Sequence, residues 1–299
     1  MAAFSALYAE VGDYLHDLGS DMDTRVKEWI NLAQQDVATE AYWPWLLRED
    51  TLSTTADITT GTVAVTNGSA AITISEAAIA TTYEYGQYYF QVDDDEIWYP
   101  IASVASTTVG TLTSTYIGDT AAAASYTIRR VLYSLPSDIS TILTVRKNSP
   151  PVRMRKITPG TLDVLDPSTE VTGDAYNYML FGSDSSGYQQ MYFHPPDTAA
   201  DVVTLRYYMV LSDLSGDADI SKIPVDFHEV LVWGACWRGF MFLDDAQNAN
   251  TSRMQYDAII RSMKKRYLTT PDDIVRKGAI DEYHTTPTHP RFPTDTVTE

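Results

Sequence analysis

The period at which hydrophobic residues recur changes twice along this chain of 299 residues. Up to about residue 50 they recur every three to four residues. From residue 51 to 130 they form short runs separated by turn signals, and after strand-like stretches the helical spacing returns near residue 225. Helices and strands place side chains with different periods, so one pattern does not fit the other element. The order predicts a β-segment inserted into a helical host domain.

Two helices are expected at the start. The apolar face of the first comprises Phe4, Leu7, Tyr8, Val11, Leu15 and Leu18, and Gly19 is placed to end it. The second is expected to be capped by Asp23 or Thr24. Its apolar stripe comprises Val26, Trp29, Ile30, Ala33, Val37 and Ala41. It should end near Tyr42, because Pro44 keeps the preceding residue out of the helical conformation.

The segment from residue 51 to 130 is expected to be a small all-β barrel or sandwich. Residues 62–66 and 71–74 flank Asn67-Gly68, which predicts a hairpin, and residues 87–92 and 96–101 form a second one. Residues 109–116 and 125–131 supply two more strands, separated by Gly118-Asp119 and an alanine run. Residues 51–56 and Arg129-Arg130 are the expected hinges.

The remaining chain predicts central strands and a helical hairpin. Strands are expected at residues 142–145, 152–157, 189–194 and 202–210, with a basic edge formed by Arg153, Arg155 and Lys156. Pro224 is expected as the first residue of an apolar helix from Val225 to Leu243, where Gly234 and Gly239 allow a neighbour to approach closely. A second helix follows to about Leu268, with Met254, Ile259 or Ile260, Met263 and Tyr267 inward.

The predicted fold class is α+β, divided into four parts: 1–50 and 131–270 as the host domain, 51–130 as the insertion, and 271–299 as an extended tail. The tail is polar and proline-rich and cannot build a core of its own. Its basic residues and spaced apolar anchors suit strand addition or groove docking on another protein. These are Arg276, Lys277, Ile280, Tyr283 and Phe292.

Five aromatic residues are candidates for packing between subunits. They are Trp43, Trp45, Trp233, Trp237 and Phe240. The first two belong to an aromatic-dense segment that either seals the base of the helical domain or contacts a neighbour. The other three lie on the apolar helix, which is buried within its own domain or between subunits.

Charge is unevenly distributed over this strongly acidic chain, whose formal net charge is −19. From residue 51 to 128 there is no Lys, Arg or His. Such a segment repels phosphate, which excludes DNA binding by counterion release. It is either a soluble exposed module or a surface past which DNA slides. The basic residues of the helix before the tail form either a solvated face or a binding site for an acidic protein. Binding of DNA phosphate by these residues is the less favoured alternative.

Signals for catalysis, cofactors and metals are missing. The sequence contains neither a phosphate-binding Gly-Lys-Ser/Thr loop, nor His-Glu-x-x-His, nor a Gly-x-Ser-x-Gly elbow, and the five histidines are scattered. Asp93 to Glu96 is better explained as a charged hairpin turn than as a calcium loop. Neither a membrane-spanning stretch nor a secretory signal is expected. The lone Cys236, expected as a buried hydrophobe, fits a reducing compartment.

The order of these segments resembles the phage head-to-tail adaptor family in its version with an inserted β-domain. Four stretches carry the resemblance: WINLAQQDVA (29–38) followed by WPWL (43–46); GTVAVTNGS (61–69) and YTI (126–128); DAYNY (174–178) through MYFHPPD (191–197) to LRYY (205–208); and IPVDFHEVLVWGAC (223–236). Together they extend over most of the chain.

The resemblance implies a non-enzymatic virion protein assembled in the bacterial host cytoplasm and located in the neck. It implies a ring, a dodecamer, between the portal and the tail or nozzle proteins, with genomic DNA passing through without specific binding. It also implies that the tail after Pro271 docks on the portal. The alternatives are a tail or baseplate structural protein, a carbohydrate-binding module using Tyr83, Tyr89, Trp98 and Tyr99, and a cell-wall hydrolase, for which no acid pair is found.

Overall fold

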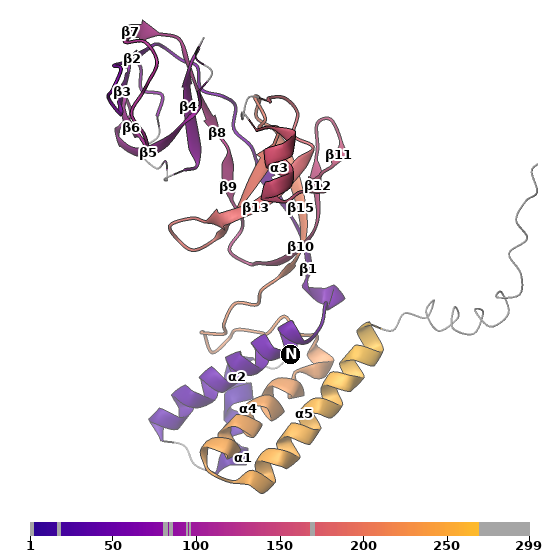
Figure 1. Ribbon diagram of the computed structural model, residues 1–299. Coiled ribbons are helices and arrows are strands. Elements are labelled where there is room, and N and C mark those ends of the chain that lie inside the picture. The colour runs from indigo at the N-terminus through magenta and orange to yellow at the C-terminus, as the bar shows by residue number, and fades with distance from the viewer. Residues whose placement is uncertain are drawn as a thin grey trace, which may run out of the picture. The chain divides into compact units, whose positions relative to one another are not determined.

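The computed structural model describes residues 3–16, 19–79, 83, 86–93, 95, 97–167 and 171–268. Its mixture of helices and antiparallel sheets confirms the α+β class. The chain forms two compact units (Figure 1). We call Met1–Leu46 with Leu211–Glu299 the helical unit, and Leu47–Val210 the sheet unit. The four-part division made from the sequence stays a prediction.

The helical unit contains α1 (Phe4–Leu15), α2 (Ser20–Glu40), α4 (Glu229–Phe242) and α5 (Ala246–Tyr267). Helix α4 packs against the other three, as Figure 1 shows. Side chains of α2 also hold the segment before α4: Gln34 donates to the Ser212 carbonyl at 2.9 Å and accepts from the Ser221 hydroxyl at 2.6 Å. Within the described residues, no helix is long and apolar enough to cross a membrane.

The predicted end of the first helix and the predicted start of the second were wrong. Helix α1 stops at Leu15, because His16 takes the left-handed cap conformation and its N–H bonds to the Gly12 carbonyl. Gly19 is the N-cap of α2, which therefore begins before Asp23 and Thr24. Asp21 and Asp23 lie in the first turn, where acids interact favourably with the helix dipole. The predicted end before Pro44 is confirmed, since α2 ends at Glu40 and a 3-10 turn covers Pro44–Leu46.

The start of α4 and the inward face of α5 also differ from expectation. Pro224 has an extended conformation and precedes a 3-10 turn, Val225–Phe227, so α4 begins only at Glu229. Met254, expected inward, is 70% exposed. Ile260 and Met263 are buried as predicted, and Tyr256 is buried as well. Asp245 caps α5 by accepting from the Asn248 N–H.

Within the sheet unit, residues 63–130 form one seven-stranded antiparallel sheet, in the order β7-β2-β3-β6-β5-β4-β8. Its strands are β2 (Val63–Val65), β3 (Ala71–Ile74), β4 (Tyr88–Val92), β5 (Tyr99–Ser106), β6 (Val109–Leu112), β7 (Ala121–Ala124) and β8 (Tyr126–Arg130). Six of them, all but β7, supply the buried residues of a single core cluster. The sheet therefore curls around one core, as Figure 1 shows.

Both predicted hairpins of this sheet are confirmed. Strand β2 pairs with β3 around Asn67-Gly68, where Gly68 has φ +83°, and β4 pairs with β5. The alanine run expected to separate strands is itself β7, because pairing with β2 outweighs the weak strand preference of alanine. Arg129-Arg130 is no hinge either, since both residues lie in β8.

Two four-stranded sheets complete the sheet unit, in the orders β1-β15-β10-β11 and β12-β13-β14-β9. Their strands are β1 (Leu47–Ser53), β9 (Leu132–Ser134), β10 (Ile139–Lys147), β11 (Val152–Arg153), β12 (Arg155–Lys156), β13 (Asn177–Ser183), β14 (Gln189–His194) and β15 (Val202–Met209). A short helix, α3 (Pro159–Leu165), lies between β12 and β13.

Two expectations for these sheets need correction. Thr51 to Ser53, expected as part of a hinge, belong to β1 and pair with β15, about 150 residues later. The single strand expected at 152–157 is two short strands in different sheets, β11 beside β10 and β12 parallel to β13. The predicted strand ending at Pro195-Pro196 is confirmed by β14.

Candidate functional site

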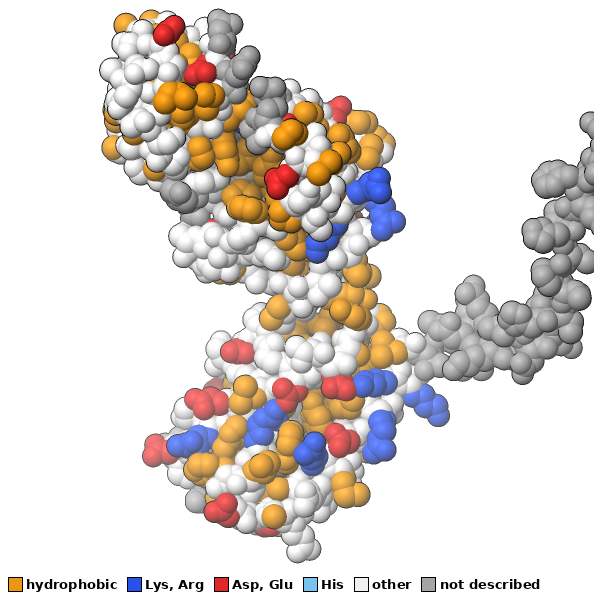
Figure 2. Space-filling view, in the orientation of Figure 1, with side chains coloured by type: hydrophobic (Ala, Val, Ile, Leu, Met, Phe, Trp, Pro, Cys, Tyr) orange, Lys and Arg blue, Asp and Glu red, His pale blue; other side chains and the backbone are white. Residues whose placement is uncertain are grey.

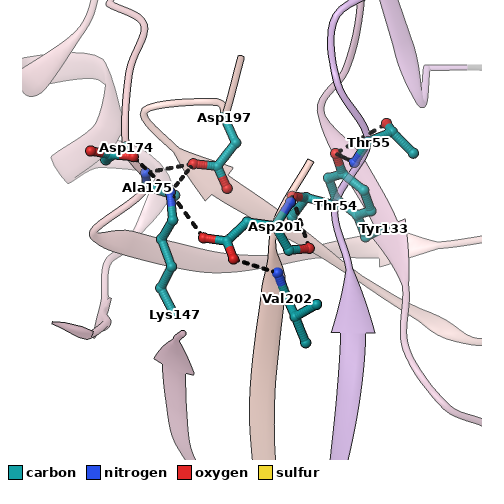
Figure 3. Close-up of polar contacts among 9 residues, drawn as sticks. All are labelled: Thr54, Thr55, Tyr133, Lys147, Asp174, Ala175, Asp197, Asp201 and Val202. Atoms are coloured by element: carbon teal, nitrogen blue, oxygen red, sulfur yellow. Dashed lines mark hydrogen bonds and ion pairs between the residues drawn. The ribbon is translucent and has the colours of Figure 1, made fainter. Parts of the chain in front are cut away.

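A buried charge cluster lies where the ends of several strands of the sheet unit meet (Figure 3). Lys147, the last residue of β10, is 3% exposed. Its Nζ lies 2.6 Å from Asp197 Oδ1, 3.0 Å from Asp174 Oδ1 and 3.5 Å from Asp201 Oδ2. Burial disfavours the charged lysine, but the hydrogen bonds to Asp197 and Asp174 outweigh that effect, so the pKa of Lys147 is raised.

Further hydrogen bonds connect this cluster to both small sheets. Asp197 Oδ1 also accepts from the Ala175 N–H at 2.9 Å, just before β13. The carbonyl of Asp201 accepts from the Thr54 N–H at 2.8 Å, at the end of β1. Next to it, the Thr55 N–H donates to the Tyr133 hydroxyl of β9 at 3.2 Å. The arrangement joins strand ends of the two sheets, which is a structural role.

Sequence reasoning missed the Lys147 cluster. The lysine is separated by 27 residues from Asp174 and by 50 from Asp197. One signal was present: Val145 and Lys147 fall on the same face of β10, and Val145 is fully buried. A lysine at an inward strand position requires acidic partners. Their identity depends on how the two sheets are connected.

A second buried ion pair lies beside an apolar pocket in the sheet unit. Arg129 of β8 donates to both carboxylate oxygens of Asp57, and its guanidinium lies 4.6 Å from the centre of the Trp98 ring. The pocket has a volume of about 420 Å³. Its lining includes Tyr89, Trp98, Arg129, Leu162, Met179 and Tyr192. Burial raises the pKa of Tyr192 to about 12, so its hydroxyl remains protonated at neutral pH.

Several of the aromatic rings considered for a carbohydrate site are already in contact with other side chains. Tyr83 stacks on Tyr88 with the ring centres 3.4 Å apart. The ring of Tyr99 is buried against Tyr116, and the guanidinium of Arg129 lies over Trp98. A sugar-binding platform needs exposed ring faces, so these contacts count against that alternative.

The two tryptophans after α2 have different environments. Trp43 is completely buried in the helical unit, and its indole N–H donates to the Val37 carbonyl at 2.6 Å. Trp45 stacks on Trp43 with ring centres 6.0 Å apart but is only half-buried, and its buried indole N–H has no hydrogen-bond partner among the described residues. Trp43 thus has the environment of a core plug, and Trp45 retains accessible surface.

The three aromatic candidates on α4 are all half-buried. Trp233 contacts Tyr14 of α1, with ring centres 5.1 Å apart. Trp237 contacts Tyr256 and lies under the guanidinium groups of Arg238 and Arg253. The apolar surface continues through Met241, Phe242 and Leu243, which are exposed and which the sequence reasoning did not single out.

Two of the basic residues of α5 are neutralised within the helical unit. Lys264 pairs with Glu40 at 2.5 Å and Arg266 with Asp226 at 2.7 Å. The predicted portal-binding residues Arg276, Lys277, Ile280, Tyr283 and Phe292 lie outside the described residues.

The described residues contain no group of three or more His, Cys, Asp and Glu that could hold a metal ion. Cys236 is buried on α4 as predicted, and burial raises the pKa of its thiol to about 12. A thiol with such a pKa is a poor nucleophile at neutral pH. His228 is buried as well, with its Nε2 2.9 Å from the Ile223 carbonyl.

The model of the SU10 adaptor protein family matches residues 112–276, which is more than half of the chain. The chain therefore belongs to this family of phage head-to-tail adaptors, a structural family and not an enzyme class. No curated protein matches the chain.

Proposed function

We propose that this protein forms a closed ring, a dodecamer, in the virion neck, with the portal on one side and tail or nozzle proteins on the other. The family match carries this proposal; it includes strands β9 to β15 of the two small sheets and both α4 and α5. The ring is assembled in the host cytoplasm, and the genome passes through its lumen without specific binding.

A closed ring needs two different, complementary flanks on every subunit. In the proposed ring, the half-buried Trp45, Trp233, Trp237 and Phe240 supply apolar contact area on the helical unit, continued by Met241 and Phe242. Large aromatic side chains contribute strongly to protein interfaces. Trp43 contributes indirectly, since its buried ring supports Trp45.

The proposed contact with the portal is made by the segment after Pro271. Arg276 and Lys277 supply charge, and Ile280, Tyr283 and Phe292 supply spaced apolar anchors. An extended segment of this kind docks by strand addition or by laying its anchors into a groove. Deleting residues 271–299 should then abolish binding to the portal while leaving the folded units intact.

The test is negative-stain imaging of the purified protein, alone and mixed with the portal protein of its phage. Rings seated on the portal are expected, even where the protein alone stays monomeric. Particles that remain separate from the portal would contradict the proposal. Trimers would favour a tail or baseplate protein, and glycan binding would favour a carbohydrate-binding module.

A further inference from the structure

Four exposed basic residues gather where the chain passes from one small sheet to the other. They are Arg146 on β10, Arg153 on β11, and Arg155 and Lys156 on β12. Arg146 and Arg153 are direct partners across the antiparallel pair. We call these four residues the basic cluster. Figure 2 shows Lys and Arg side chains over β11 and β12, whereas the visible face of the seven-stranded sheet has none.

Among the described residues, this cluster forms no ion pair; Arg146 interacts with Glu49 only through a longer-range Coulombic attraction, and Glu49 is itself paired with Arg206. None of the four residues has a carboxylate within 4 Å among the described ion pairs. Like charges directly opposite each other on paired strands are destabilising. A chain with a net charge of −19 nevertheless concentrates four cations here. An anionic partner would remove this repulsion.

Three of these residues, Arg153, Arg155 and Lys156, border a hollow of about 390 Å³. Its apolar lining comprises Leu143, which is 43% exposed, and the buried Val145, Met154 and Tyr178. A nucleic-acid backbone would match the charge but leave the apolar lining unfilled. A protein segment that carries both acids and an aliphatic side chain would match both features.

One end of the seven-stranded sheet has this composition. Asp93, Asp95 and Ile97 lie in the loop between β4 and β5, and Ile117 and Asp119 lie in the loop between β6 and β7. Ile97 is 38% exposed and Ile117 is 63% exposed. We call these five residues the acidic tip.

The two loops of the acidic tip touch. A Cβ atom on Gly118 would lie 2.7 Å from Asp95 Oδ2. The Asn67 side chain donates to the Ile117 and Gly118 carbonyls at 3.0 and 2.9 Å, and the Ile117 N–H donates to the Tyr99 hydroxyl at 3.3 Å. The loop with Ile117 is therefore held to the sheet, which lowers the entropy cost of docking.

We propose that the acidic tip of one copy docks into the basic hollow of the next copy around the ring. The inference rests on the proposed ring function and names one of its contacts. The pairing joins two different surfaces, so it is heterologous and can close into a ring. Helix α5 is less suited as the basic partner, because Lys264 and Arg266 are already paired with Glu40 and Asp226.

Two charge-reversed variants test this pairing. Variant A carries Arg146→Glu, Arg153→Glu, Arg155→Glu and Lys156→Glu, so both of its surfaces are acidic. Variant B carries Asp93→Arg, Asp94→Arg, Glu96→Arg and Asp119→Arg, so both are basic. Ring formation on the portal protein is measured by mass photometry and negative-stain imaging. Each variant alone should assemble at least about tenfold less than wild type, because like charges then meet across the contact.

Mixing the two variants gives the decisive result. In an equimolar mixture, each tip can meet a hollow of opposite charge, so rings of alternating A and B subunits should form. A single chain with both sets of substitutions should also assemble. Thermal unfolding checks that each variant is folded. Lys265→Glu, an exposed change on α5, is the control at a site outside the contact and should assemble like wild type.

Assembly of A and B at wild-type level would overturn the pairing but leave the adaptor proposal standing. The pairing would also be overturned if A and B each failed to assemble and mixing them did not restore ring formation. A variant A that forms rings normally but no longer retains a short DNA duplex would make the basic cluster a DNA contact instead. Wild-type protein that forms no ring on the portal would contradict the proposed function itself.

Discussion

Lys147 shows how much a single buried charge determines in the sheet unit. Its ammonium group lies among the carboxylates of Asp174, Asp197 and Asp201, each just before or between strands. Removing the lysine would leave the buried carboxylate of Asp197 and the largely buried one of Asp201 without their cation in a medium that solvates them poorly, whereas Asp174 is exposed to solvent. The cluster therefore specifies how the strand ends meet, and the cost of breaking it exceeds that of a surface pair.

We expect Lys147→Met to destabilise the protein by about 3–5 kcal/mol. Methionine keeps most of the side-chain volume, so the measured loss of stability reports the cost of leaving the carboxylates unpaired. Urea unfolding measures the change. Lys265→Met, at an exposed position on α5, is the matched control and should change stability by less than about 0.5 kcal/mol. A Lys147→Met protein as stable as wild type would show that the carboxylates find other partners.

Alkaline pH should destabilise the fold through buried tyrosines. Burial raises the pKa of Tyr192, Tyr207 and Tyr256 to about 12, above the ordinary value of 10.0. The unfolded chain loses these protons first, so their contribution to stability is complete below pH 10 and is lost as the pH rises toward 12. The unfolding temperature should fall steeply over that interval.

The tyrosine contribution is measured by repeating the pH series with Tyr256→Phe. This variant should lose less stability between pH 10 and pH 12 than the wild type. Tyr42→Phe, at a residue that is 66% exposed, serves as the control. An unchanged slope in Tyr256→Phe would assign the alkaline loss to other groups.

At the scale of elements, close approach between helices depends on two glycines of α4. A Cβ atom at Gly234 would lie 2.7 Å from Ala33 Cβ of α2, and one at Gly239 would lie 2.7 Å from Leu15 Cδ1 of α1. Leucine can turn its methyl groups aside, but a Cβ moves only with its backbone. The contact at Gly234 is therefore the stricter one.

Gly234→Ala should destabilise the helical unit by about 1–3 kcal/mol, and Gly239→Ala by less. Circular dichroism during thermal unfolding measures both. Gly160→Ala on α3 is the matched control, because nothing lies within 4 Å of the added methyl group. That change should be neutral or stabilising by up to about 1 kcal/mol, owing to the helix propensity of alanine. Equal effects at the three positions would refute the packing argument.

At the scale of the whole molecule, the order of segments along the chain allows the sheet unit, but not the helical unit, to fold from one continuous stretch of sequence. The sheet unit is one continuous stretch, Leu47–Val210, with its own core around Phe90 and Ile128. The helical unit is split, since α1 and α2 bury their apolar faces against α4, which follows nearly 190 residues later. The first two helices cannot complete their core before the C-terminal helices are present.

Residues 47–210 expressed alone should therefore fold, with a cooperative thermal transition and a strand-rich circular dichroism spectrum. Residues 1–46 alone should be largely unfolded, because isolated helices of this length are marginal without tertiary packing. Dispersed amide signals in a nuclear magnetic resonance spectrum would distinguish the two cases. A folded 1–46 fragment would contradict the assigned dependence on α4.

Local patterns in the sequence were sufficient for the α+β class, the hairpin at Asn67-Gly68, the strand ended by Pro195 and the close approach at Gly234. The first three depend on residues close to one another in the sequence, and the fourth depends on the missing side chain of glycine. Only the tertiary structure decided that Thr51 is in a strand, that the alanine run is β7, and that Lys147, Arg129 and Asp57 are buried ion-paired residues. Those outcomes depend on partners tens to more than a hundred residues away, and the energy of such pairing exceeds any local preference.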